Sequence, residues 1–360
     1  MSTNKVTNAG VSASREVDTL LIEKFTGRVK EAYVKQENLM RFFDVQRVEG
    51  TNTVSEKFMG ETQLQVLSAG KAPEATTTDF DKNALVVDTA VISRNAEALI
   101  HNIQSDIEST HSKLAANQTS QLSRLEDEML VQQCIYGAQL NTKANRTKPR
   151  VTGHGFSQQI SINAAQAGDP DAFIGALELA LERLLTGHDG EGDGIDLQGL
   201  YIMLPWSQFN ILRDAERIVN GDYNTFQGDT VSGFTLKSYN VPVIPSNRFP
   251  RLVNGKVISR THLLSTENSN RRYTANEDQA NAKAIIFSGD ALLVGVTLNL
   301  ESDIWWDKNS KSYIIDSWQS EGAIPSIWEA VAVVDTVGNT ENAEVKARAS
   351  RKVAKIKSVT

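Results

Sequence analysis

The acidic residues Asp189, Glu191 and Asp193 have the spacing in this chain that comes closest to a metal-binding motif. Alternating carboxylates followed by a glycine at the sixth place match the beginning of a calcium-binding loop. Such a loop also needs a bidentate glutamate at position 12, and position 12 here is Leu200. The segment can equally be a hydrated turn between a helix and a strand, so the sequence identifies no metal site.

The histidines and the single cysteine form no catalytic or metal-binding motif. No His-Glu-x-x-His pair exists, and Cys134 has no cysteine partner at a spacing used for zinc or for a disulfide. Because Cys134 lies beside apolar residues in a helical pattern, we expect a buried small side chain rather than a nucleophile. The histidines are His101, His111, His154, His188 and His262.

Nucleotide-binding and hydrolase motifs are also missing from the sequence. Gly190, Gly192 and Gly194 do not form a GxGxxG fingerprint, and neither GxxxxGK[ST] nor GxSxG occurs. The sequence therefore predicts no catalytic, cofactor-binding or metal-binding residue, and a protein that is not an enzyme. The alternative is an enzyme with an unrecognised site in 171–282.

Two other groups of residues could bind a partner. Four tryptophans crowd into one region, where a ligand-stacking platform is less favoured than a cluster in the core or at an interface. The segment 344–360 contains six basic residues and one acid. It is either a solvated tail or a contact for nucleic acid or an acidic protein, and we expect that it is not needed for assembly. The tryptophans are Trp305, Trp306, Trp318 and Trp328.

The composition is that of a globular chain. It has 360 residues, of which 40% are hydrophobic, and a formal net charge of -7, which allows two or more domains. The excess of acid argues against nonspecific nucleic-acid binding by the whole surface. The N-terminus lacks a hydrophobic signal core and no stretch approaches 18 apolar residues, so we expect no membrane span and a reducing cytoplasm.

Two segments have the pattern of long helices. Residues 105–136 have apolar side chains at helical spacing, and Gly137 is placed to end this helix in a left-handed conformation. Residues 169–187 can begin with Asp169 as the cap and Pro170 at the first position. Further expected elements are a helix at 14–34, a strand at 41–48, a buried strand at 199–205, a helix from 205, strands joined by proline turns in 231–250, a polar loop at 266–283, and strands within 284–306 and 311–334.

Residues 60–92 have the pattern of two strands around a polar middle of small residues. They contain no His, Cys or Trp and no catalytic motif. An isolated hairpin is at best marginally stable in water. We therefore expect that neighbouring copies of the chain hold this hairpin, that 60–90 is mobile in a free subunit, and that assembly protects it.

The order of these elements resembles the Hong Kong-97 type capsid fold of tailed phages, most closely that of short-tailed podoviruses of the autographivirus kind. Four segments carry the resemblance: 37–74, 80–130, 201–212 and 231–246. The fold class is then α+β, with an N-terminal arm, an extended hairpin loop, a long spine helix, a peripheral domain and an axial domain. The implied divisions are an arm at 1–48, an extended loop at 49–95, a peripheral domain at 96–170 and 283–335, an axial domain at 171–282 and a polar basic tail at 336–360.

The resemblance implies a major capsid protein that assembles into hexamers and pentamers of an icosahedral shell around phage double-stranded DNA. It implies as partners further copies, a scaffolding protein, a portal and the packaged DNA, but no membrane. The location would be the virion, with assembly in the host cytoplasm. Some members of the family cross-link a loop lysine to an asparagine, but no partner for Lys71 or Lys82 can be placed. An encapsulin-like compartment protein is the alternative with the same fold.

Overall fold

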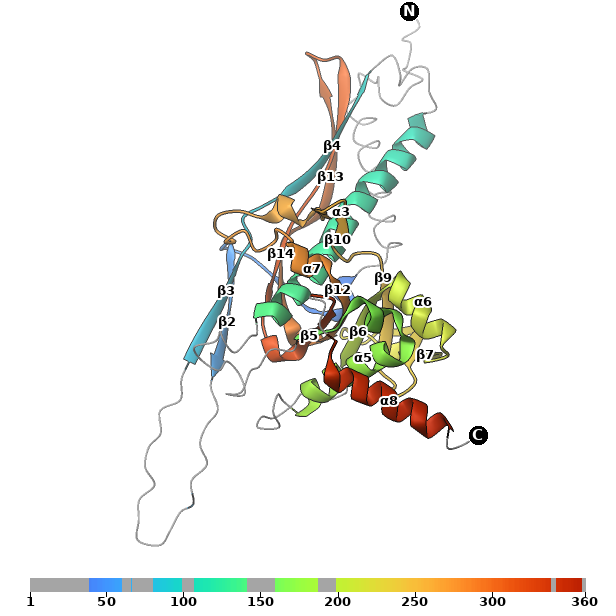
Figure 1. Ribbon diagram of the computed structural model, residues 1–360. Coiled ribbons are helices and arrows are strands. Elements are labelled where there is room, and N and C mark those ends of the chain that lie inside the picture. Colours follow the sequence, from blue (N-terminus) through green and yellow to red (C-terminus); the bar gives the residue numbers. More distant parts are fainter. Residues whose placement is uncertain are drawn as a thin grey trace, which may run out of the picture.

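The computed structural model describes residues 39–59, 66, 80–98, 107–140, 159–186, 199–337 and 341–357. These residues form a seven-stranded sheet, a four-stranded sheet and a long helix that packs on both (Figure 1). The helix expected at 14–34, the acidic segment 189–196 and Lys71 lie outside them. None of the described helices has the length and hydropathy of a membrane-spanning segment.

The seven-stranded sheet has the strand order β5-β15-β12-β6-β9-β8-β7. Its strand β6 is apolar throughout because both faces are covered. Ile202 and Leu204 pack in the core formed with α5, whereas Tyr201 and Met203 pack in the core formed with α3. The strands are β5 (Gln159–Ser161), β6 (Leu200–Pro205), β7 (Ile218–Asn224), β8 (Thr230–Leu236), β9 (Pro242–Ser246), β12 (Ala282–Ser288) and β15 (Val331–Asp335).

Helix α5 (Pro170–Thr186) confirms the helix expected from its cap and first position. The Asp169 carboxylate accepts a hydrogen bond from the Asp171 amide, at 3.3 Å from Asp169 Oδ1. The shorter helices are α4 (Ala164–Gly168), α6 (Trp206–Asp214) and α7 (Glu277–Ala280), and the 3-10 turns are η2 (Leu39–Phe42), η5 (Thr261–Leu264), η6 (Gly289–Ala291) and η7 (Trp328–Ala330).

The four-stranded sheet has the order β1-β13-β14-β4. The strands β4, β13 and β14 extend as a ribbon beside α3 (Figure 1). Ile304 and Ile315 lie opposite each other on the ribbon and are buried with Ala115 of α3. The elements are β1 (Asp44–Arg47), β4 (Val91–Ala98), β13 (Leu292–Asp307), β14 (Ser312–Pro325) and α3 (Ile107–Leu140).

The expected end of the long helix at Gly137 is wrong, because α3 continues to Leu140. A Cβ atom at Gly137 would lie 3.0 Å from the Cβ of Pro325. The glycine therefore allows α3 to approach β14 closely and does not cap the helix.

The C-terminal segment is not a loose polar tail, since α8 (Ala343–Lys357) packs against α5. Val345 is fully buried, next to the position where a side chain at Gly175 would begin. Arg183 of α5 forms an ion pair with Glu344 at 3.2 Å, and Glu182 forms one with Arg348. The sequence pattern did not predict this helix, because the segment itself contains few apolar residues. The apolar surface against which α8 packs is supplied by α5.

Three expected divisions do not match the packing. The boundaries at 170/171 and 282/283 cut the seven-stranded sheet, because β5, β12 and β15 pair within the same sheet as β6. The arm expected at 1–48 ends in core residues: the Phe43 ring stacks on Phe287, with centroids 4.9 Å apart. The remaining assignment of axial and peripheral domains stays a prediction.

Two loop expectations also change. The expected polar loop 266–283 contains α7 and the start of β12. Two of the prolines expected in turns, Pro242 and Pro245, lie inside β9, whereas Pro250 lies between β9 and β10. The turn before β9 instead contains Asn240, whose φ of 55° is in the left-handed region that asparagine tolerates.

The remaining pairs of strands are two-stranded. β2 (Thr53–Met59) pairs with β3 (Phe80–Val86), and β10 (Arg251–Val253) pairs with β11 (Lys256–Ile258), both antiparallel. The extended loop expected at 49–95 is therefore divided, because its last residues belong to β4 in the four-stranded sheet.

Candidate functional site

The residues with chemical potential do not come together in the described part of the chain. No group of three or more His, Cys, Asp or Glu side chains there could hold a metal ion. Cys134 is a buried core residue, as expected, and burial raises the pKa of its thiol. His262 is exposed, and its Nδ1 lies 3.0 Å from the Ser259 carbonyl oxygen.

The adjacent residues Trp305 and Trp306 do not pack together. Trp305 and Trp306 are adjacent on β13, so their side chains point to opposite faces of the ribbon. Trp306 packs on Tyr313 with ring centroids 4.8 Å apart. Trp305 is partly exposed on the other face, where the Arg94 guanidinium lies 5.9 Å from its ring centroid.

The base of the hairpin β2–β3 packs against its own chain. Gly295 and Gly322 lie opposite each other on β13 and β14, and the Leu85 side chain fills the space above them. A Cβ atom would lie 2.9 Å from Leu85 at Gly295 and 3.3 Å at Gly322. The Asn83 side-chain amide also donates to the Pro325 carbonyl at 2.8 Å. The expectation that 60–90 depends on a neighbour is therefore wrong for its last residues.

The edge of β14 beyond the end of β4 is closed by a tyrosine. The pairing of β4 with β14 ends at Gln319. At Ala323 the buried Tyr273 hydroxyl donates to the carbonyl oxygen at 2.9 Å and accepts from the amide at 3.1 Å. One side chain thus satisfies both backbone groups of a residue that has no strand partner on that side.

Buried carboxylates lie where α3 packs on β14. Asp127 accepts hydrogen bonds from the Leu39 amide at 3.0 Å and from Arg248 Nε at 3.1 Å. Burial raises the pKa of Glu321 well above its usual value, and the negative charges of Glu126 and Asp127 raise it further. This cluster therefore brings three acidic side chains together where α3 packs on β14.

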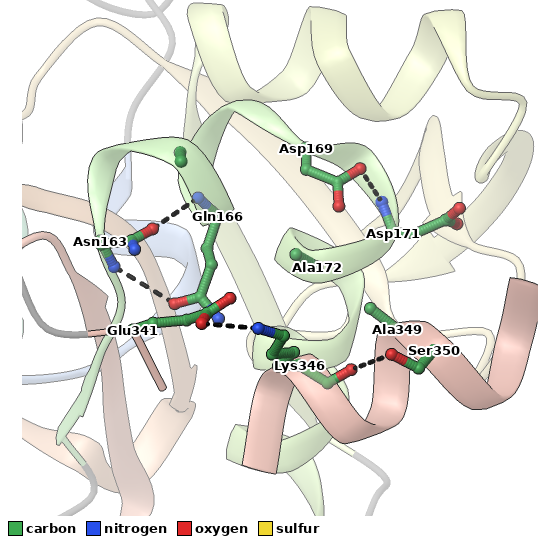
Figure 2. A pocket seen from close by; sticks show the side chains of 10 residues that line it. Asn163, Gln166, Asp169, Asp171, Ala172, Glu341, Lys346, Ala349 and Ser350 are labelled. Carbon is green, nitrogen blue, oxygen red and sulfur yellow. Dashed lines mark hydrogen bonds and ion pairs between the residues drawn. The ribbon is translucent and has the colours of Figure 1, made fainter. Parts of the chain in front are cut away.

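An open cavity of about 720 Å³ lies between α4, α5 and α8 (Figure 2). Asn163 and Gln166 form a capping box there, and Lys346 Nζ lies 2.8 Å from Glu341 Oε2. Gln166 also exchanges two hydrogen bonds of 3.0 Å with the backbone of Asn342. These contacts position the start of α8, so the cavity lies along a structural seam.

Comparison with known proteins identifies the fold. No protein-family model matches the sequence, and no curated protein shows significant similarity to it. The mature capsid of bacteriophage PhiM1 is similar in structure, with a TM-score of 0.59 and 17% identity over 84% of this chain and 88% of that one. The capsid of cyanophage P-SCSP1u has a TM-score of 0.61 and 13% identity over 82% and 87% of the two chains. The chain therefore has the Hong Kong-97 type capsid fold, which confirms the expected fold class.

Proposed function

We propose that this chain is the major capsid protein of a tailed phage and that it assembles into a closed icosahedral shell. The observation that carries the proposal is the fold shared with two phage capsids over more than four-fifths of the chain.

The hairpin β2–β3 supports an assembly role through its connectivity. Leu85 of β3 pairs with Val54 near the start of β2, and its side chain packs on β13 and β14. Met59 and Phe80 pair at the opposite end of the hairpin. Residues 60–79 join the chain at that far end. We propose that these residues contact an adjacent copy, where weak contacts add up across a symmetric shell.

The finer features of the proposal follow the family resemblance. They are hexamers and pentamers as building units, a scaffolding protein and a portal as partners, double-stranded DNA as cargo, assembly in the host cytoplasm and kinship with podoviruses of the autographivirus kind. Purified particles that contain DNA support these features, whereas particles filled with one host enzyme support the encapsulin alternative.

Sedimentation of the purified chain, expressed with its scaffolding protein, tests the proposal. We expect closed species of several megadaltons for the natural chain. A variant with 60–79 replaced by a short Gly-Ser linker should remain a folded subunit with an unchanged unfolding transition and should not close shells. A natural chain that remains monomeric or dimeric at every concentration would refute the proposal.

A further inference from the structure

The hairpin β10–β11 presents a basic and apolar face that is exposed among the described residues. In the antiparallel register, Arg251 lies opposite Ile258 and Val253 lies opposite Lys256, so these four side chains share one face. All four are exposed, and Val253 and Ile258 are 45% and 58% exposed. We call these four residues the hairpin patch.

The surroundings of the hairpin patch suit a docking surface. A two-stranded hairpin with three-residue strands is marginal on its own, and β10 and β11 contact α7 on one side. An adjoining cavity of about 660 Å³ is lined in part by Trp206, Leu252 and Val253. Val253 belongs to both the hairpin patch and the lining of this cavity, and Trp206 in the same lining is 43% exposed, so the apolar surface continues from the hairpin into a concave region.

A second uncovered surface lies along β7, the last strand of the seven-stranded sheet. Outermost strands have one row of backbone groups without a strand partner and favour pairing with another chain. Val219 on β7 and Phe226 in the following turn are each 41% exposed. Asp222, on the opposite face of β7 from Val219, and Asp229 after the turn are exposed as well, so the four residues line this edge of the sheet from both faces. We call these four residues the edge patch.

The two patches have opposite charge. Residues 248–260 contain four basic residues and no acid, whereas 218–236 contain two acids and no base. Among the described residues, neither Arg251 nor Lys256 has an acidic partner, and neither Asp222 nor Asp229 has a basic one. Each patch therefore lacks the countercharge that the other patch offers.

The patches lie at different places on the same subunit. The hairpin lies near α7, away from β7 (Figure 1). Trp206, which lines the cavity beside the hairpin, follows directly after β6. In the sheet, the strands β9 and β8 lie between β6 and β7. Pairing a patch with itself in a two-fold dimer would oppose like charges. Pairing the hairpin patch of one copy with the edge patch of the next is a head-to-tail contact, which closes into a ring when the rotation permits.

We infer that the hairpin patch of each copy docks on the edge patch of the neighbouring copy within a capsomer. This inference rests on the proposed capsid function and deepens it by naming the two contacting surfaces. The apolar side chains exclude water from the centre of the contact, and the charge pairs Arg251 and Lys256 with Asp222 and Asp229 set its direction.

Cross-linking with a short bismaleimide tests this docking. The variant Val253→Cys/Val219→Cys places one thiol in each patch, and the only natural cysteine, Cys134, is buried. On assembled particles we expect a ladder of covalent oligomers that ends at five and six chains. Each single variant should give no ladder, and Val253→Cys/Ala347→Cys, with its second thiol exposed on α8, serves as a control with none.

Charge reversal provides a second measurement. Arg251→Glu/Lys256→Glu and Asp222→Lys/Asp229→Lys should each lower the particle yield at least tenfold. Their combination should restore most of the yield, because the charges are again opposite. All substituted residues are exposed, so the unfolding midpoint should stay unchanged.

The outcomes separate this inference from the proposed function. Natural particles whose double-cysteine variant gives no ladder would overturn the docking and leave the capsid function intact. The same holds if the two reversals assemble normally or fail to rescue each other. A natural chain that forms neither particles nor cross-linked oligomers would overturn both.

Discussion

Gly295 of β13 and Gly322 of β14 face each other across the sheet and leave the space that Leu85 occupies. The buried Leu85 side chain is thereby enclosed with Val48 and Val87. A glycine pair in mid-strand weakens a strand in isolation, and here it allows a second layer of chain to approach. The base of the hairpin is fixed by this contact.

Leu85→Ala should therefore loosen the hairpin base. A buried leucine-to-alanine change costs about 2–5 kcal/mol when the cavity cannot collapse. We expect a lower free energy of unfolding in denaturant and faster hydrogen exchange in 80–87. Leu298→Ala, at a partly exposed position on β13, is the control and should change much less. Unchanged exchange in 80–87 would contradict the role given to Leu85.

Tyr273→Phe should destabilise the end of β14. The change leaves both backbone groups of Ala323 without the hydroxyl partner, and a buried unsatisfied group costs about 1–3 kcal/mol. Thermal unfolding measures the loss. Tyr239→Phe is the matched control, since no hydrogen bond of its hydroxyl is seen among the described residues. Equal midpoints for the two variants would show that Tyr273 does not close the edge.

Glu321→Gln should change how stability depends on pH. The pKa of Glu321 is raised in the folded chain, so the folded chain holds this proton more tightly than the unfolded chain. The associated stability is present below the ordinary carboxyl pKa of 4.5 and is lost as the pH rises through the raised value. The variant lacks this titration.

Denaturation midpoints across this pH window provide the measurement. The midpoint of Glu321→Gln relative to that of the natural chain should rise as the pH increases above the ordinary carboxyl pKa of 4.5. Glu126 and Asp127 on α3, Gln319 on β14 and Arg248 bound to Asp127 surround the carboxyl and remain in place. Glu301→Gln, on an exposed part of β13, should show no such trend. A difference that is constant across the window would contradict the prediction.

Val345→Ala should weaken the packing of α8 on α5. Val345 is fully buried, and removing buried methyl groups costs about 0.8 kcal/mol for each carbon. We expect a lower unfolding midpoint, and a larger loss when 343–360 is deleted. Ala347→Ser, on the exposed side of α8, is the control. A deletion variant as stable as the natural chain would contradict the packing role of α8.

The sequence predicted those helices and strands that are determined by residues within the same segment. The cap at Asp169, Pro170 at the first position and a regular apolar stripe identified α5. The continuous apolar run of β6 identified a buried strand. The order of the elements then indicated the fold, which the structural comparison confirmed.

Long-range contacts explain the errors. Gly137 had the local character of a helix end, and its role depends on Pro325, which is far away in the sequence. The order of α8 depends on α5, and the space at Gly295 depends on Leu85. The acidic cluster around Glu321 joins α3 to β14, so no spacing within one segment could reveal it.

Cryo-electron microscopy of the chain expressed with the proposed scaffolding protein tests the central claim most directly. The account predicts closed icosahedral shells built from five-fold and six-fold capsomers, with each subunit showing the two sheets and α3 described above. Fields without closed particles, together with a chain that elutes as a monomer or dimer at every concentration and salt condition, would contradict it.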